Sequence, residues 1–255
     1  MKISADFKKR VLAREWLAGS FVNLGSSVTV EITGNLGFDW ILIDHEHGPG
    51  GEDTLLHQMQ AASATPAFPM VRIANNDPTR FKRVLDVGAQ GVMVPWVSTV
   101  EEAKAAVNAL RYTPRGMRGI AKQHRGVGYG GNFEEYYRNA HDWIVLATQL
   151  ETPEAVANSE AIAAIDGVDV LFVGPTDLTF NMGIPDQYDN PKFIDALKKI
   201  LASAKKSGKA AGILVHNPQL VTVCRDIGYT FVALGSDGGA MMTGLKANLA
   251  VLRGK

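Results

Sequence analysis

The sequence predicts a (β/α)8 barrel, and three observations support this fold class. Short apolar runs rich in β-branched residues recur at fairly regular intervals, and most are continuously apolar, as is typical of parallel strands buried on both faces. Helical patterns lie between these runs, so strands and helices alternate along the chain. The 255 residues match the length of such a barrel. The alternative, an open doubly wound sheet, would carry a glycine-rich fingerprint after its first strand, and the segment LGSSVTVE lacks one.

Eight apolar runs are the candidate strands of this barrel. In order they are residues 18–23, 39–44, 68–73, 91–97, 143–150, 169–174, 209–215 and 229–235.

Helices are expected between the strands, and several of them have recognisable start signals. Asp77 is a candidate N-cap with Pro78 at the first helical position, and Thr99 and Glu102 have the spacing of a capping box. Prolines also lie near the starts of three further helices. The expected helices are residues 52–64, 78–88, 99–110, 153–165, 190–206, 217–228 and 238–253.

Composition indicates one soluble unit over residues 1–255, because no stretch reads as a linker or a charge block. The 26 basic and 26 acidic residues cancel, which argues against nucleic acid or an anionic membrane as a partner. A single cysteine, Cys224, rules out an intrachain disulfide or a cysteine zinc cluster and fits a helix core position. The first 15 residues lack the apolar core of a signal peptide, and no run approaches the length of a membrane span. We therefore expect a cytoplasmic protein.

The connection between the fourth and fifth strands is too long for an ordinary barrel loop. It carries six glycines among residues 116–131 and a set of basic side chains, and long loops in compact domains are usually functional or mobile. The pattern assigns no function to residues 111–137. The basic residues are Arg111, Arg115, Arg118, Lys122 and Arg125.

In a (β/α)8 barrel the active site lies at the carboxyl ends of the strands. Carboxylates, histidines and one arginine follow the predicted strands at that end, so the sequence predicts that they converge on one rim. They are Asp44, His45, Glu46, His47, Arg72, Gln149, Glu151, Gly174, Thr176, Asp177, His216, Asn217, Ser236 and Asp237.

Glu151 and Asp177 follow consecutive strands, which lie about 5 Å apart in a sheet. Two carboxylates this close repel each other unless a proton or a cation lies between them. A hard divalent cation with oxygen ligands, Mg²⁺ or Mn²⁺, would relieve the repulsion. The other interpretation is that each side chain caps the helix that follows it.

The segment Asp44-His45-Glu46-His47-Gly48-Pro49 contains a candidate general base. His47 lies further beyond the strand than His45, and Asp44 could orient an imidazole and raise its basicity. His45 is expected to point back into packing. The alternative is a histidine with satisfied hydrogen bonds in a turn.

Arg72 ends an otherwise apolar strand and must find an anion there. A substrate oxyanion would suit a guanidinium, and so would a structural ion pair with Asp44 or Glu151. In the segment GSDGG, Ser236 or Asp237 reads as an N-cap, with a phosphate site at the helix start as the alternative.

Six segments taken together resemble the HpcH/HpaI aldolases, from about residue 15 to about residue 250. They are FDWILIDHEHGP, VRIANNDP, LDVGAQGVMVPWVSTVEEAKAAVNALRYTPRGMRG, QLETPEAV, DVLFVGPTDL and FVALGSD. These aldolases are class II, metal-dependent pyruvate aldolases, among them 4-hydroxy-2-oxoheptanedioate and 2-keto-3-deoxy-sugar-acid aldolases.

The resemblance implies a role for each matching residue. Glu151 and Asp177 match the two metal-binding carboxylates, and Arg72 matches the arginine that holds the keto oxygen and enolate of pyruvate. His47 and Asp44 match the histidine–aspartate pair that serves as base and proton relay. The remaining matches are a site glutamine at Gln149, the turn for the pyruvate carboxylate at Gly174 and Thr176, and an acid contributed by the neighbouring subunit at Asp86.

The resemblance also implies an assembly and a cofactor. The last helix of the barrel would be exchanged between subunits of a homo-oligomer, usually a hexamer of dimers, and the metal would be Mg²⁺ or Mn²⁺, with Co²⁺ or Zn²⁺ open. His45 departs from the family pattern, since relatives often have a small polar residue there. The loop from Arg115 to Tyr137 is variable, so the aldehyde is not carried over.

The expected chemistry is reversible cleavage of a 4-hydroxy-2-oxo acid to pyruvate and an aldehyde through a stabilised enolate. Oxaloacetate decarboxylation at the same site and a barrel that only binds an oxo acid are alternatives. A lysine Schiff-base aldolase is a third, but no lysine lies within a candidate strand core.

Overall fold

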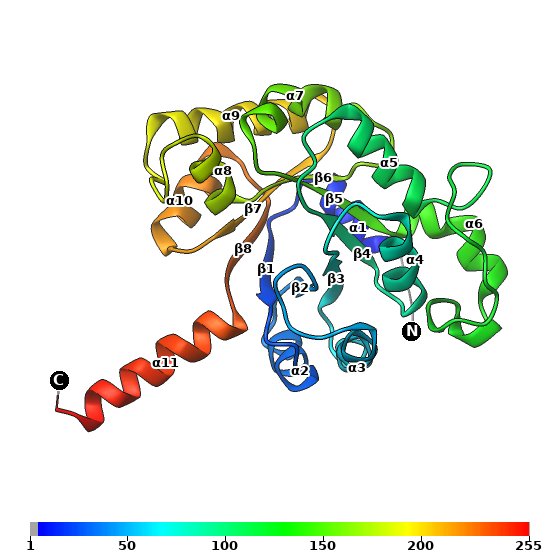
Figure 1. The fold of residues 1–255 in the computed structure, drawn as a ribbon, viewed down its shortest axis with the longest axis horizontal. Coiled ribbons are helices and arrows are strands. Elements are labelled where there is room, and N and C mark those ends of the chain that lie inside the picture. Colours follow the sequence, from blue (N-terminus) through cyan, green and yellow to red (C-terminus); the bar gives the residue numbers. More distant parts are fainter. Residues whose placement is uncertain (1–4, 255) are drawn as a thin grey trace.

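The computed structural model describes residues 5–254, which form a closed barrel of eight parallel strands in the order β1 to β8 (Figure 1). This confirms the predicted fold class. Residues 1–4 and 255, part of the single unit predicted over 1–255, lie outside the described range. The strands are β1 (Leu17–Val22), β2 (Trp40–Asp44), β3 (Phe68–Arg72), β4 (Gly91–Val94), β5 (Val145–Leu150), β6 (Val170–Val173), β7 (Ala210–Val215) and β8 (Phe231–Ser236).

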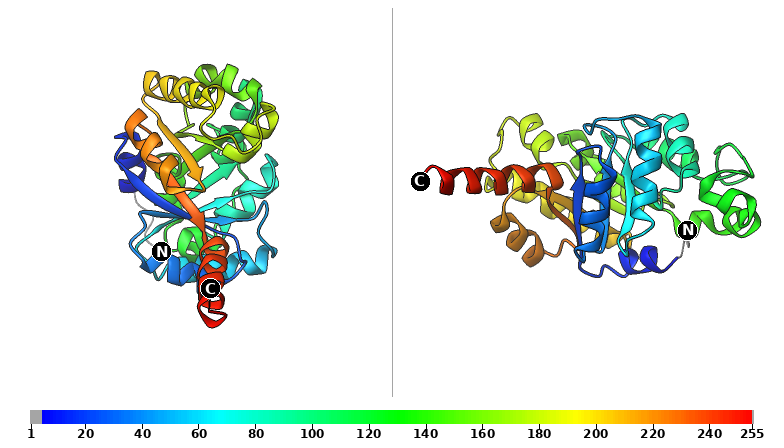
Figure 2. Two further views of the ribbon diagram at one scale, coloured as in Figure 1. Left: turned by 90° about the vertical axis from the view of Figure 1, so that its left-hand side faces the viewer. Right: turned by 90° about the horizontal axis from the view of Figure 1, so that it is seen from below.

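Helices cover the outside of the barrel between the strands (Figures 1 and 2). They are α1 (Asp6–Leu12), α2 (Ser27–Asn35), α3 (Glu52–Ala62), α4 (Pro78–Asp86), α5 (Val100–Leu110), the 3₁₀ helix η1 (Arg125–Gly130), α6 (Phe133–Trp143), α7 (Pro153–Ala163), α8 (Pro175–Asn181), α9 (Pro191–Lys206), α10 (Pro218–Ile227) and α11 (Asp237–Leu252).

The predicted start signals operate as expected. The Asp77 side chain accepts a hydrogen bond from the Thr79 amide, and Thr99 and Glu102 form a complete capping box. Ser236 caps α11 by accepting from the Gly239 amide, so the N-cap interpretation of the GSDGG segment holds. Five helices were not predicted: α1, α2, α6, α8 and η1. Helix α2 was not predicted because its β-branched residues have low helix propensity. The Ser26 side chain compensates for this low propensity by capping the helix.

The fourth strand is shorter than the predicted 91–97. It ends at Val94 because Pro95 has no amide to donate to the sheet and because Trp96 adopts a left-handed backbone conformation with φ of 55°. The strand predicted at 143–150 begins at Val145, since Trp143 closes α6.

Aromatic side chains fill the barrel interior. The Trp40 indole stacks on Phe231 with ring centroids 4.0 Å apart, and Phe172 meets both rings edge-on. A Cβ at position 19 would overlap the indole, which is why β1 carries a glycine there. At the amino end of the strands Phe7 of α1 stacks on Phe68 at 3.9 Å. The barrel is therefore packed rather than open, and the space for a ligand lies at its other end.

The last helix, α11, extends away from the barrel and buries no residue (Figures 1 and 2). Its apolar side chains Met241, Met242, Leu245 and Leu249 are exposed. None of the helices within residues 5–254 is long and apolar enough to cross a membrane.

Candidate active site

A pocket of about 1010 Å³ lies at the carboxyl end of the strands, where the sequence predicted a site. Residues from β1, β2, β3, β5, β6, β7 and β8, or from the turns that follow them, line it. The predicted site residues among its lining are Asp44, His47, Arg72, Gln149, Gly174, Thr176, Asp177, His216, Ser236 and Asp237. Glu151 is not part of the lining but contacts Gln149, which is.

Arg72 is 8% exposed and holds two carboxylates at once. Its Nε and Nη2 donate to the two oxygens of Asp44 at 2.9 and 2.7 Å, and its Nη1 lies 3.0 Å from Oε2 of Glu46. The ion pair with Asp44, one of the predicted alternatives for Arg72, is thus present. Burial alone would raise the pKa of Asp44, but the hydrogen bonds and charge of Arg72 hold that pKa below its usual value.

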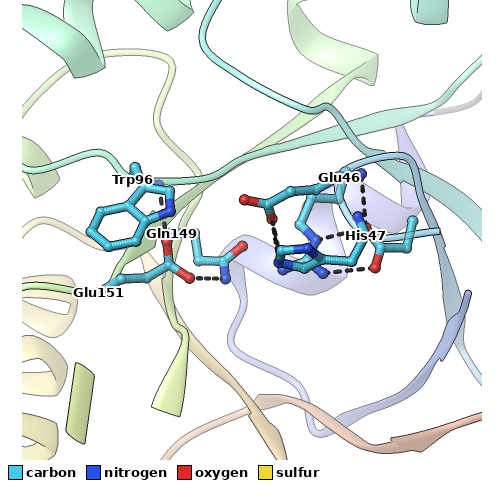
Figure 3. A network of polar contacts seen from close by, with 7 residues as sticks. Glu46, His47, Trp96, Gln149 and Glu151 are labelled. Atoms are coloured by element: carbon cyan, nitrogen blue, oxygen red, sulfur yellow. Dashed lines mark hydrogen bonds and ion pairs between the residues drawn. The ribbon is translucent and has the colours of Figure 1, made fainter. Parts of the chain in front are cut away.

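The structure does not pair Asp44 with the His47 ring among the described residues. Its Oδ1 instead accepts from the backbone amides of Glu46 and His47 at 3.1 and 3.4 Å, which fixes the turn. The His47 side chain is 70% exposed, and its Nε2 lies 3.8 Å from Oε2 of Glu46 (Figure 3). Glu46 is therefore the carboxylate beside the predicted base. Asp44 acts on it only through the backbone of the turn.

Glu151 is a buried carboxyl group that forms no ion pair within residues 5–254. It is 2% exposed, its Oε2 accepts from the Trp96 amide at 3.0 Å, and its Oε1 accepts from Nε2 of Gln149 (Figure 3). Burial raises its pKa to about 8, and the charges of Asp177 and Glu46 act in the same direction. A carboxylate in this state gains by meeting a cation.

The alternative that Glu151 caps a helix does not hold. Thr152 caps α7 by accepting from the Ala155 amide, and Gly174 occupies the N-cap position of α8. Asp177 lies in the first turn of α8, and no side-chain cap bond forms at that helix start. Both carboxylates are therefore available for a ligand at the pocket.

Gly174 permits a close approach of the β6–α8 turn to this carboxylate. A Cβ at this position would overlap Oε1 of Glu151 and lie 2.8 Å from Nε2 of Gln149. Oε1 of Gln149 is buried without a hydrogen-bond partner among the described residues. The turn, the amide and the carboxylate thus form one tightly packed wall of the pocket.

Two residues of this site were missed by the sequence reasoning. Glu46 was passed over in favour of its histidine neighbours, although a carboxylate so close to a strand end was a usable signal. Burial raises the pKa of Glu46, against the opposing charge of Arg72. Trp96 was read as part of a strand, yet its left-handed backbone aims its amide at Glu151. The dipeptide Pro95-Trp96 gave a hint of a strand end, but none of a hydrogen bond.

Three other residues named in the sequence analysis do not line the pocket. His45 points back toward α3, where its Nε2 lies 3.0 Å from Oε1 of Gln58. Asp86 ends α4 at the amino end of the barrel and pairs with Arg118 at 2.9 Å, so one subunit alone does not bring it to the pocket. Cys224 is buried, as predicted.

A packed barrel whose rim gathers an arginine, a histidine and buried carboxylates around one pocket defines a (β/α)8 enzyme site. A sequence profile of the HpcH/HpaI aldolase/citrate lyase family matches residues 17–243. A protein of Rhizobium etli named pyruvate aldolase is 40% identical over 241 residues, covering 94% of each chain.

A 4-hydroxy-2-oxo-heptane-1,7-dioate aldolase of Escherichia coli is 38% identical over 232 residues, covering 91% of this chain and 88% of the relative. The crystal structure of an HpcH/HpaI aldolase/citrate lyase family protein from Burkholderia cenocepacia superposes with a TM-score of 0.93 at 31% identity, covering 98% of this chain and all of that one. The chain belongs to the HpcH/HpaI aldolase/citrate lyase family, as its resemblance to these aldolases implied.

Proposed function

We propose that this protein is a divalent-metal-dependent aldolase that reversibly cleaves a 4-hydroxy-2-oxo acid to pyruvate and an aldehyde. The observation that carries this proposal is the buried Glu151 carboxylate, which contacts Gln149 of the pocket lining and has the charge of Asp177 nearby. The names of two relatives, pyruvate aldolase and 4-hydroxy-2-oxo-heptane-1,7-dioate aldolase, point to the same reaction.

Two carboxylates would supply the protein ligands of a hard divalent cation, since the described residues contain no group of three or more His, Cys, Asp or Glu side chains that could hold a metal. Glu151 and Asp177 would hold it, and carboxylate oxygens are the ligands that Mg²⁺ and Mn²⁺ prefer; Co²⁺ or Zn²⁺ remain as alternatives. The raised pKa of Glu151 comes from burial first and from the nearby charges of Asp177 and Glu46 second, and a cation would offset both effects. The single amide and the glutamine that contact Glu151 leave lone pairs free on its oxygens. The bound cation would act as a Lewis acid on the keto oxygen of the substrate.

Arg72 would stabilise the enolate that forms when the C3–C4 bond breaks. Its guanidinium is fixed by Asp44 and Glu46, so it does not reorganise as the oxyanion develops. The turn at Gly174 and Thr176 would hold the substrate carboxylate, and Gln149 would contact the same half of the substrate. These residues together bind the part that becomes pyruvate.

His47 would accept the proton of the C4 hydroxyl as the bond breaks. The electron pair of the C3–C4 bond moves into the enolate, the aldehyde leaves, and a proton added at C3 completes pyruvate. Glu46, 3.8 Å from Nε2 of His47, would stabilise the imidazolium that forms. We assign the carboxylate partner of His47 to Glu46, whereas the sequence pattern favoured Asp44.

Two competing chemistries receive less support. A Schiff-base aldolase needs a lysine in the pocket, and none of the described residues that line it is a lysine. Oxaloacetate decarboxylation would use the same enolate, so we regard it as a side activity. Binding without turnover does not explain a positioned histidine on the rim.

We also propose a homo-oligomer in which α11 packs on a neighbouring subunit, with a hexamer of dimers as the family arrangement implies. Six large apolar side chains of α11 are exposed, and Val28, Ile32 and Leu36 present a second apolar surface around α2. In such an assembly Asp86 would reach the site of a neighbour. Leu245→Lys should yield smaller particles in sedimentation velocity, whereas Ala202→Lys on the exposed face of α9 should not. An unchanged sedimentation coefficient in Leu245→Lys would refute the exchange.

One buried cysteine suits a reducing compartment, and we place the protein in the cytoplasm.

The direct test of the function is pyruvate release from a panel of 4-hydroxy-2-oxo acids with and without EDTA. We expect release from at least one of these acids, loss of release in EDTA, and recovery when Mg²⁺ or Mn²⁺ is added back. Release that persists in EDTA would favour a Schiff base and contradict the proposal.

A further inference from the structure

Three polar side chains form a connected cluster at the lip of the pocket, next to the turn whose backbone is assigned to the substrate carboxylate. Oγ1 of Thr176 lies 3.3 Å from Nε2 of His216 and 3.3 Å from the hydroxyl of Tyr188. The Tyr188 hydroxyl donates to Oδ1 of Asp186 at 2.8 Å. Thr176 and His216 both line the pocket, and Tyr188 lies behind them.

Strand register brings Thr176 and His216 together. Val173 of β6 pairs with Ile213 of β7, and each of the two side chains follows its paired residue by three positions. Both therefore leave neighbouring strands at the same height above the barrel. The contact between them belongs to the rim of the site and lies beside Asp177, the proposed metal ligand.

Nδ1 of His216 can act either as a donor or as an acceptor, depending on how the hydrogen bonds of the cluster are arranged. Tyr188 gives its proton to Asp186, so Thr176 donates either to Tyr188 or to His216. In the first case Nε2 of His216 carries a proton and Nδ1 is an acceptor; in the second case Nδ1 carries the proton. Nδ1 makes no hydrogen bond among the described residues in either case. A ligand hydroxyl can match both states because it also donates and accepts, whereas a carboxylate can only accept.

The charges around the pocket disfavour an anion on the aldehyde side. Its lining contains the carboxylates of Asp44, Asp177 and Asp237, while Arg72 is its only arginine or lysine among the described residues. Arg72 is already held by Asp44 and Glu46. Desolvation by its surroundings lowers the pKa of His216, against the opposing charge of Asp186, which favours an uncharged ring near neutral pH. Among the described residues of one chain, a distal carboxylate would therefore find no free cation at this lip.

We propose that His216 and Thr176, supported by Tyr188, determine the aldehyde specificity of the enzyme by binding a hydroxyl group on the aldehyde half of the substrate. The inference rests on the proposed aldolase function and extends it. The substrate class would be a 4-hydroxy-2-oxo acid with a further hydroxylated, uncharged tail, rather than one that ends in a second carboxylate.

Three substrates of six carbons test the class in the wild-type enzyme. They are 4,5,6-trihydroxy-2-oxohexanoate, 4-hydroxy-2-oxohexanoate and 4-hydroxy-2-oxohexanedioate, which differ only in a hydroxylated, alkyl or carboxylate tail. We expect kcat/KM for the hydroxylated tail to exceed the other two by about five- to tenfold, the effect of one net hydrogen bond. A carboxylate tail that is cleaved equally well or better overturns the inference and leaves the aldolase standing. Cleavage of none of the three would overturn the aldolase function itself.

Substitutions of His216 and Thr176 then test whether these side chains cause the preference for a hydroxylated tail. His216→Leu and Thr176→Val should each lower the ratio of kcat/KM between hydroxylated and alkyl tails by about five- to tenfold, and His216→Gln should restore most of it. His57→Leu, an exposed histidine on α3, is the matched control and should leave the ratio unchanged. The ratio is independent of the amount of folded enzyme. A ratio that stays at the wild-type value in both His216→Leu and Thr176→Val refutes the assignment.

Discussion

The two ends of the barrel each bury a carboxyl group, and burial raises the pKa of both, but the two ends supply different partners. Asp169 at the start of β6 and Glu151 at the end of β5 are both 2% exposed. Asp169 meets Nζ of Lys8 at 2.9 Å and accepts from the Leu146 amide at 2.9 Å. Among the residues that the structure describes, the hydrogen-bond partners of Glu151 are one backbone amide and one glutamine, and Asp177 is nearby.

This difference separates a structural charge from a functional one. Lys8 also donates to the carbonyls of Ile144 and His141, so the charges and donors at the amino end are satisfied within the chain. At the carboxyl end the acidic residues outnumber the available cations, and the structure leaves the deficit for a ligand to fill. A buried carboxyl group by itself does not mark a site, whereas one that has no cationic partner among the described residues is a candidate for a ligand contact.

The largest expected effect comes from removing a carboxylate charge at the carboxyl end of the barrel. Glu151→Gln should lower cleavage by more than about 10³-fold, because oxygen ligation of a hard cation relies on the carboxylate charge. Asp177→Asn should behave in the same way. Steady-state pyruvate release at saturating Mn²⁺ measures both.

Asp169→Asn is the matched substitution at the other end. It leaves Lys8 buried without its anion and should lower the free energy of unfolding by about 3 kcal/mol while the folded enzyme keeps its activity. Urea titration and activity per folded molecule separate these effects. If Asp169→Asn silenced the enzyme without destabilising it, the contrast between the two ends would be wrong.

The proposed base should give the next largest effect. His47→Ala should slow aldol cleavage by about 10²- to 10⁴-fold, as expected for the loss of a general base. Oxaloacetate decarboxylation takes no proton from a hydroxyl, so it should survive the substitution better. His45→Ala is the control, since its ring is held by Gln58 away from the pocket. Equal losses in both reactions would mean that His47 organises the site instead of accepting a proton.

Arg72→Lys should cost about 10²-fold in turnover. Lysine keeps the charge but loses the planar fork that holds Asp44 and Glu46 while it faces an oxyanion. Exchange of the C3 protons of pyruvate should fall in parallel, because it passes through the same enolate. An exchange rate close to that of the wild type would make Arg72 a purely structural partner of Asp44.

The sequence predicted the barrel and the end at which the site lies, because both follow from strand order and from which residues end each strand. It left the partner of Asp44 open between His47 and Arg72, because the choice depends on the register that places Asp44 opposite Arg72. The left-handed conformation of Trp96 and the helix α2 were missed for local reasons, a strained turn and a β-branched helix. The exchange of α11 between subunits was expected only from the family resemblance, since the apolar pattern of this helix does not distinguish packing on its own barrel from packing on a neighbour.

The pKa of Glu151 gives the smallest effect and the most specific one. In the metal-free protein the folded state holds this proton up to about pH 8, while the unfolded chain releases it near 4.5. The stability that this proton contributes is therefore present below about pH 4.5 and is lost as the pH rises through about 8. Glu151→Gln should flatten that part of the stability profile, and thermal unfolding with EDTA at several pH values measures it.

Calorimetric titration of the metal-free enzyme with Mn²⁺ at pH 7, in buffers of different ionisation enthalpy, tests the central claim most directly. We expect one ion per chain and release of close to one proton, because Glu151 must lose its proton to become a ligand. Binding should disappear in Glu151→Gln and persist in Asp169→Asn. Normal Mn²⁺ affinity in Glu151→Gln, or binding that releases no proton, would contradict the assignment of the metal to this end of the barrel.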